Sequence, residues 1–88
     1  MMDPLAVFKE TDNQFYEALC NDRKLAFSDG ALSKKTKLLI GLALDAAKHS
    51  EGGVMTLASQ AMEAGATKEE IAETLRITYL IDGVVSTY

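Results

Sequence analysis

The chain has 88 residues, a net charge of −4, one cysteine and one histidine, and a chain of this length forms a single domain, residues 1–88, with a marginal core. The lone Cys20 excludes an intramolecular disulfide, and the lone His49, without a cysteine cluster, argues against a structural zinc site. We therefore predict neither a metal nor a cofactor, and the acidic charge balance argues against a nucleic-acid partner.

Hydrophobic spacing predicts an all-α fold of four helices and no strands. The first predicted helix begins at Asp3 and Pro4, because aspartate suits the N-cap and proline suits the first helical position. Its apolar spacing fades near residues 21–22, and the Ser-Asp-Gly sequence of residues 28–30 indicates a turn.

The second predicted helix covers residues 33–48, with Ser33 as its N-cap, and it is apolar on nearly every face. A helix that is hydrophobic all round is buried all round, and so short a chain has little to cover it except another subunit. Gly41 costs about 1 kcal/mol relative to alanine, which indicates a neighbouring helix at close range. Asp45 interrupts the pattern, and we favour a solvated stripe over a cavity or subunit contact. We predict a homo-oligomer with residues 38–44 at the subunit contacts.

Two further helices follow in the second half of the chain. Two glycines at residues 52–53 break the chain, and the third predicted helix covers residues 54–64. Gly65 is predicted to end it in the left-handed backbone conformation. The fourth predicted helix covers residues 68–81, and its start is marked by Thr67, which is followed three residues later by a glutamate in the pattern of a capping box.

The sequence shows neither a secretory signal nor an apolar run of the roughly 18 residues that a membrane span needs. We therefore predict a cytoplasmic location and no membrane partner. The basic cluster of Lys34, Lys35 and Lys37 is better explained as the solvated first turn of a helix than as a phosphate site.

Two stretches carry a family resemblance: residues 32–43, LSKKTKLLIGLA, and residues 61–73, AMEAGATKEEIAE. In this order and at this separation they resemble the carboxymuconolactone decarboxylase family, which includes the alkyl hydroperoxidase D-like proteins. The likeness covers about residues 27–83. It implies a small all-α domain of the alkyl hydroperoxidase D-like kind that assembles into homo-oligomers, commonly trimers or hexamers.

The family's active site does not carry over to this sequence. In the peroxidase-like members a glutamate, two cysteines and a histidine form a thiol proton relay, and counting from both flanks places these four relay positions on Leu38, Ser50, Gly53 and Leu57. A shift by one residue, which puts His49 and Gly52 at the cysteine positions, supplies no thiol either. Peroxide reduction needs a thiolate and a second thiol that resolves the sulfenic acid. We expect Leu38 and Leu57 to be buried close together, with no solvated cavity between them.

Two polar side chains near this region have both a functional and a structural interpretation. His49, beside Ser50 and Glu51, has the chemistry of a general base that Glu51 orients. We favour the interpretation that it complements the dipole at the end of the second helix. Cys20 is far from the relay positions in sequence, and we interpret it as a half-buried apolar residue rather than a redox thiol.

Two functional hypotheses remain open from the sequence. The first is a non-catalytic oligomeric module that binds a partner or a small molecule. The second is an enzyme, for example a decarboxylase or isomerase of a small acid, in which His49 and Ser50 are the acid–base groups. In that enzyme Lys37 or Arg76 would hold the substrate carboxylate. A pocket with His49 pointing inward favours the enzyme, and apolar packing at the relay positions favours the module.

Overall fold

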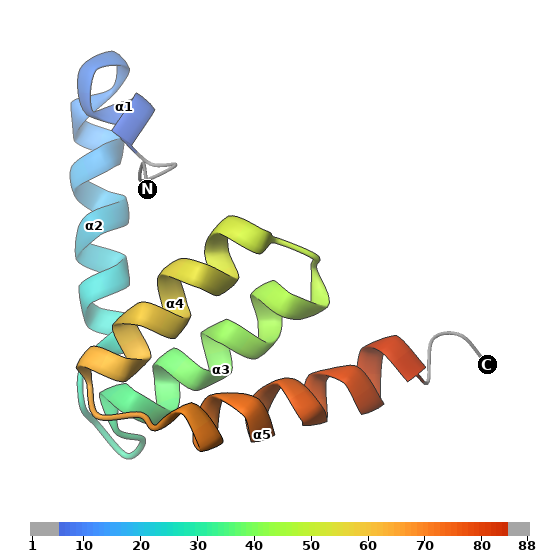
Figure 1. Cartoon of the computed structure of the whole chain (residues 1–88). Coiled ribbons are helices and arrows are strands. Elements are labelled where there is room, and N and C mark those ends of the chain that lie inside the picture. Colours follow the sequence, from blue (N-terminus) through green and yellow to red (C-terminus); the bar gives the residue numbers. More distant parts are fainter. Residues whose placement is uncertain (1–5, 85–88) are drawn as a thin grey trace.

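The structure, a computed structural model, describes residues 6–84. Within this range every regular element is a helix and there is no strand, which confirms the predicted all-α fold. The helices are α1 (Ala6–Thr11), α2 (Asn13–Phe27), α3 (Lys34–Ala47), α4 (Glu51–Glu63) and α5 (Lys68–Thr78), and α5 continues into a π-helical segment, η1 (Tyr79–Val84) (Figure 1).

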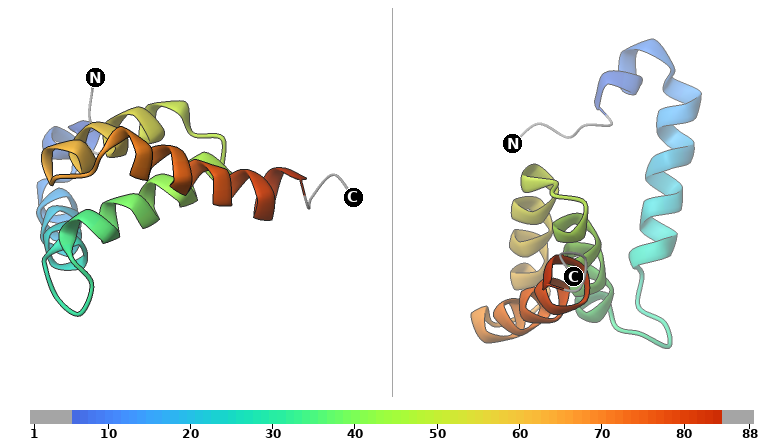
Figure 2. Two further views of the ribbon diagram at one scale, coloured as in Figure 1. Left: turned by 60° about the horizontal axis from the view of Figure 1, so that its bottom comes forward. Right: turned by 90° about the vertical axis from the view of Figure 1, so that its right-hand side faces the viewer.

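α3 is the central helix, since α2, α4 and α5 all contact it. α3 and α4 form an antiparallel hairpin, and α5 packs along α3 (Figures 1 and 2). α2 leaves this three-helix body as an arm that touches it near Phe27, and α1 folds back on the far end of the arm. The rings of Phe8 and Phe15 meet edge to face there, with centroids 5.2 Å apart.

The first predicted helix is in fact two helices, which corrects the prediction of one continuous segment. Asp12 separates α1 from α2, and its Oδ1 accepts a hydrogen bond from the backbone N–H of Phe15 at 3.2 Å. An aspartate that satisfies a backbone donor in this way starts a new helix. α2 also runs past residues 21–22, to Phe27. The predicted start at Asp3 and Pro4 lies outside the described residues.

α3 begins where the sequence predicted, because the Ser33 hydroxyl accepts a hydrogen bond from the backbone N–H of Thr36 at 3.1 Å. A Cβ on Gly41 would lie 3.3 Å from Leu57 of α4, and this confirms the predicted close approach of a neighbouring helix.

Only one face of α3 is buried within the protomer. Leu42 is fully buried, whereas Ile40 and Leu44 are 45% and 59% exposed. Positions separated by two residues point to nearly opposite sides of a helix. The prediction that α3 is buried all round therefore does not hold for the single chain.

α4 begins at Glu51, three residues earlier than predicted, and includes the two glycines of residues 52–53 in its first turn. Glycine accepts helical backbone angles, so a glycine pair stops a helix only where the surroundings favour another conformation. α4 ends at Glu63, within one residue of the predicted end at residue 64. Gly65 has φ 103°, and the backbone N–H of Ala66 donates to the carbonyl of Ala61 at 2.9 Å, the pattern of a Schellman cap.

The capping box that opens α5 is confirmed. The backbone N–H of Glu70 donates to the Thr67 hydroxyl at 3.1 Å, and the backbone N–H of Thr67 donates to Glu70 Oε1 at 2.8 Å. The other carboxylate oxygen of Glu70 accepts from Lys35 Nζ at 3.0 Å. This one side chain therefore both caps α5 and ties it to α3. η1 carries the helix beyond the predicted end at residue 81.

The buried core of the described chain is small. It consists of Leu38, Leu42, Ala61 and Ala66, which lie on α3, on α4 and in the turn after α4. Many more large apolar side chains are exposed: Val7, Phe15, Leu25, Leu32, Ile40, Leu44, Met55, Met62, Ile77, Tyr79, Leu80 and Ile81. A single copy thus leaves most of its large apolar side chains in contact with water.

Candidate functional site

The four relay positions come from the facing sides of the α3–α4 hairpin. Leu38 is in α3, Ser50 is the N-cap of α4, Gly53 is in its first turn, and Leu57 follows about one turn later. Leu38 is 2% exposed, and the half-buried Leu57 packs against the core cluster that contains it. The expectation of close apolar packing holds, but Leu57 is less buried than we predicted.

A side chain at position 53 would need space that the Asp45 side chain now occupies. A Cβ on Gly53 would collide with the carboxylate of Asp45 and would lie 3.0 Å from Ser50 Oγ. A cysteine at this position would therefore require Asp45 to move. Asp45 is half-buried, and its carboxylate lies against the first turn of α4, where the helix N-terminus favours a negative charge. This placement replaces the solvated stripe that we favoured for Asp45.

The turn between α3 and α4 carries the two residues proposed as acid–base groups. His49 and Ser50 are both exposed, and Ser50 makes no capping hydrogen bond with its side chain. His49 has φ 58°, in the left-handed region that is uncommon for residues other than glycine. We did not predict this conformation, although histidine is among the residue types enriched there.

The residues proposed to hold a substrate carboxylate lie elsewhere. Lys37 is near the start of α3 and donates through Nζ to the carbonyl of Ser28 at 2.7 Å. His49 follows the other end of α3, and twelve residues of helix correspond to about 18 Å. Arg76 is exposed in the last turn of α5. The structure therefore separates Lys37 from His49 instead of bringing them together.

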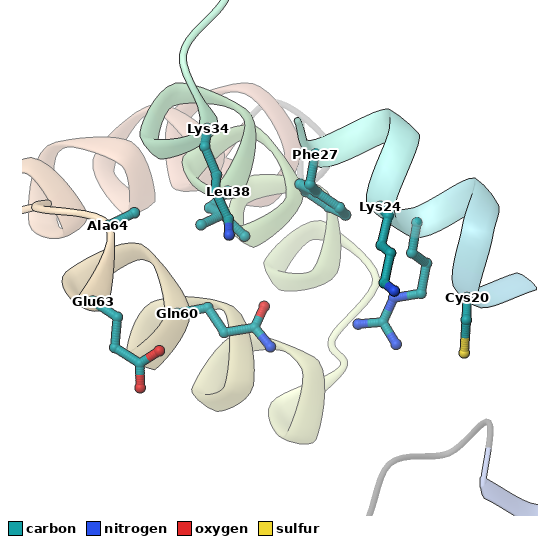
Figure 3. A pocket seen from close by; sticks show the side chains of 9 residues that line it. Cys20, Lys24, Phe27, Lys34, Leu38, Gln60, Glu63 and Ala64 are labelled. Atoms are coloured by element: carbon teal, nitrogen blue, oxygen red, sulfur yellow. The ribbon is translucent and has the colours of Figure 1, made fainter. Parts of the chain in front are cut away.

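A cavity of about 560 Å³ lies between the α2 arm and the α3–α4 hairpin. Figure 3 shows its walls: α2 on one side, the start of α3 above and the end of α4 opposite. The lining residues are Cys20, Arg23, Lys24, Phe27, Lys34, Leu38, Gln60, Glu63 and Ala64. Leu38 is the one relay position among them, and His49 and Ser50 do not line this cavity. We missed the cavity in the sequence because its walls come from three separate segments.

Within residues 6–84 no group of three or more histidine, cysteine or acidic side chains is arranged to hold a metal ion. The helices in the same range are too short or too polar for any of them to cross a membrane.

Comparison with known proteins supports the resemblance. The model of the carboxymuconolactone decarboxylase family matches residues 13–86. The uncharacterised protein MJ1511 of Methanocaldococcus jannaschii is 34% identical over 82 residues, which cover 93% of this chain and 77% of that protein. The uncharacterised protein MJ0742 of the same organism is 32% identical over 81 residues, 91% of this chain and 78% of that protein. No solved structure matches the chain. The chain belongs to the carboxymuconolactone decarboxylase family.

Proposed function

We propose that this protein is a family member without the thiol peroxidase relay and that it acts as a non-catalytic, homo-oligomeric binding module. The observation that carries the proposal is the packing of Leu38. This leucine stands at the position of the family's glutamate and is 2% exposed, within the apolar cluster against which Leu57 packs. A proton relay needs polar groups at both positions, and these side chains can neither donate nor accept a proton.

The chemistry of peroxide reduction leads to the same proposal. A thiolate attacks the peroxide and becomes a sulfenic acid, and a second thiol then forms a disulfide with it and releases water. The chain has one cysteine, Cys20 on α2. Neither the attacking nor the resolving thiol is present at the start of α4, where Ser50 and Gly53 stand instead.

Assembly into a homo-oligomer is supported by the exposed apolar side chains. Ile40 and Leu44 lie on the outer side of α3, and Ile77, Leu80 and Ile81 lie on the last part of α5 and on η1. Exposed apolar side chains on this scale mark interaction surfaces. The family resemblance points to a trimer or hexamer. The alternative, an acid–base enzyme, gains no support from the exposed positions of His49 and Ser50.

The proposal is tested by an assay of peroxide reduction coupled to a dithiol donor, with purified protein. We expect turnover no higher than in the absence of protein, because no thiol pair exists. The variant Cys20→Ser is the matched control and should behave identically. Turnover in the natural protein that disappears in Cys20→Ser would make Cys20 a working nucleophile and would refute the proposal.

A further inference from the structure

The walls of the cavity between α2, α3 and α4 carry more positive than negative charge. Three cationic side chains, Arg23, Lys24 and Lys34, line it together with one carboxylate, Glu63. The chain as a whole has a net charge of −4. The excess of cations at this cavity is therefore local and opposes the overall charge.

Two of these cations, Lys24 and Lys34, have no structural partner in the described part of the chain. In the same region Lys35 pairs with Glu70, and Lys37 donates to the carbonyl of Ser28. The ammonium groups of Lys24 and Lys34 make no hydrogen bond or ion pair within residues 6–84. Asp29 accepts a hydrogen bond from the backbone N–H of Lys34, at 2.7 Å, and not from its ammonium group.

Lys34 is exposed, so water solvates its ammonium group, and it stands at a helix position that a cation does not favour. It is the first residue of α3, and a cation at a helix N-terminus is repelled by the helix dipole. The Asp29 carboxylate already lies at this N-terminus, where it accepts from the backbone N–H of Lys34, but the ammonium group itself has no direct contact within residues 6–84. A bound anion in the cavity would supply such a contact.

The floor of the cavity is apolar. Phe27, Leu38 and Ala64 form it, and the amide of Gln60 reaches into it from α4 (Figure 3). A volume of about 560 Å³ lies in the range of small-molecule sites, which combine an apolar lining with a few polar groups. Figure 3 shows Lys24 on the α2 side and Glu63 on the opposite side, so the charged end of an anion would be directed away from Glu63.

We infer that this cavity binds a small organic anion whose charged group lies between Lys24 and Lys34 and whose apolar part packs on Phe27 and Leu38. The inference rests on the proposed binding role and names the class of ligand. It concerns the end of the α3–α4 hairpin opposite to the turn that holds His49 and Ser50.

The single cysteine provides a reporter inside the site. Cys20 is half-buried and lines the cavity, so the rate at which its thiol is alkylated responds to charges and ligands in the cavity. Iodoacetate and iodoacetamide react with a thiolate by the same displacement of iodide, and only the first is an anion. The ratio of their two rates, normalised to the ratio for 2-mercaptoethanol, therefore measures the preference of the cavity for an anion.

The experiment measures these rates by mass spectrometry on the full chain and on four variants. We expect a normalised ratio above one for the natural protein, although its net negative charge alone would place the ratio below one. Lys24→Gln, one helical turn from Cys20 on α2, should lower the ratio by about threefold, the effect of a unit charge about 6 Å away in a water-like dielectric. Lys34→Gln should lower it by less, because Lys34 lies farther from Cys20 (Figure 3). Glu63→Gln should raise it. Lys48→Gln removes a lysine that does not line the cavity and should leave the ratio unchanged.

A second measurement uses octanoate as an anionic apolar probe and octan-1-ol as its neutral counterpart. Octanoate should slow the alkylation of Cys20 by iodoacetamide, and it should do so less in Lys24→Gln and Lys34→Gln. Octan-1-ol should protect less than octanoate.

Three results would overturn the inference: equal ratios in the natural protein and all variants, no protection by octanoate, or no reaction of Cys20 with either reagent. These failures are distinct from failure of the proposed function, which is judged by peroxide turnover and by the oligomeric state.

Discussion

His49 holds the backbone conformation that lets α4 turn back along α3. Its φ of 58° costs about 1–2 kcal/mol for a residue with a Cβ, and glycine avoids this penalty. We therefore predict that His49→Gly raises the free energy of unfolding by about 1 kcal/mol in chemical denaturation. Lys48→Gly is the control, because Lys48 has an ordinary φ of −86°, and this variant should lower stability. A loss of stability in His49→Gly would show that the imidazole makes contacts that outweigh the backbone penalty.

A side chain added at Gly53 would overlap the carboxylate of Asp45. This overlap predicts an energetic coupling between the two positions. An added methyl group at position 53 gains about 1 kcal/mol of helix propensity but must displace the Asp45 carboxylate. Gly53→Ala should therefore be more favourable in an Asp45→Ala background than in the natural protein. A double-mutant cycle of unfolding free energies measures this difference. Additive values would mean that Asp45 moves aside without penalty and does not by itself exclude a side chain at position 53.

At the scale of the helices, Glu70 connects α5 to α3. The backbone N–H of Thr67 and the ammonium group of Lys35 both favour the carboxylate form, and together they hold the pKa of Glu70 below its ordinary value. A carboxyl with a lowered folded-state pKa stabilises the fold above its unfolded pKa, and this contribution is lost as the pH falls through the folded-state pKa.

We therefore predict that part of the acid sensitivity of the protein disappears in Glu70→Gln. Unfolding free energies measured from about pH 6 to about pH 3 should fall less steeply in this variant than in the natural protein. Glu69→Gln removes a neighbouring charge without removing the capping box, and it should keep the natural slope. Identical slopes for the natural protein and Glu70→Gln would refute this role of the carboxylate.

At the scale of the whole molecule, substitutions on the two faces of α3 are predicted to have different effects. Leu42 is fully buried within the protomer, and Leu44 is 59% exposed. A charge at Leu42 should unfold the chain, because a buried unpaired charge costs several kcal/mol. Leu44→Glu should keep the helical circular dichroism but weaken subunit association in light scattering at micromolar concentration. Detection of the natural protein as a stable 9.5 kDa monomer would refute the predicted assembly.

The sequence alone determined the features that depend on near neighbours. Ser33 caps α3, the Thr67–Glu70 pair caps α5, and Gly65 ends α4, each through hydrogen bonds between residues no more than five positions apart. Such bonds form wherever the local sequence permits them, so spacing predicts them. Asp12 is a local signal of the same kind, and we missed it because the apolar spacing continues across it.

Only the tertiary structure determined how segments that are distant in the sequence pack against one another. Gly52 and Gly53 are helical, although two adjacent glycines are also compatible with a break between helices. Leu38 and Leu42 face inward while Ile40 and Leu44 face outward, because α4 and α5 cover only part of α3. The cavity exists only where three helices meet. Packing between helices depends on their relative placement, which spacing along one helix does not specify.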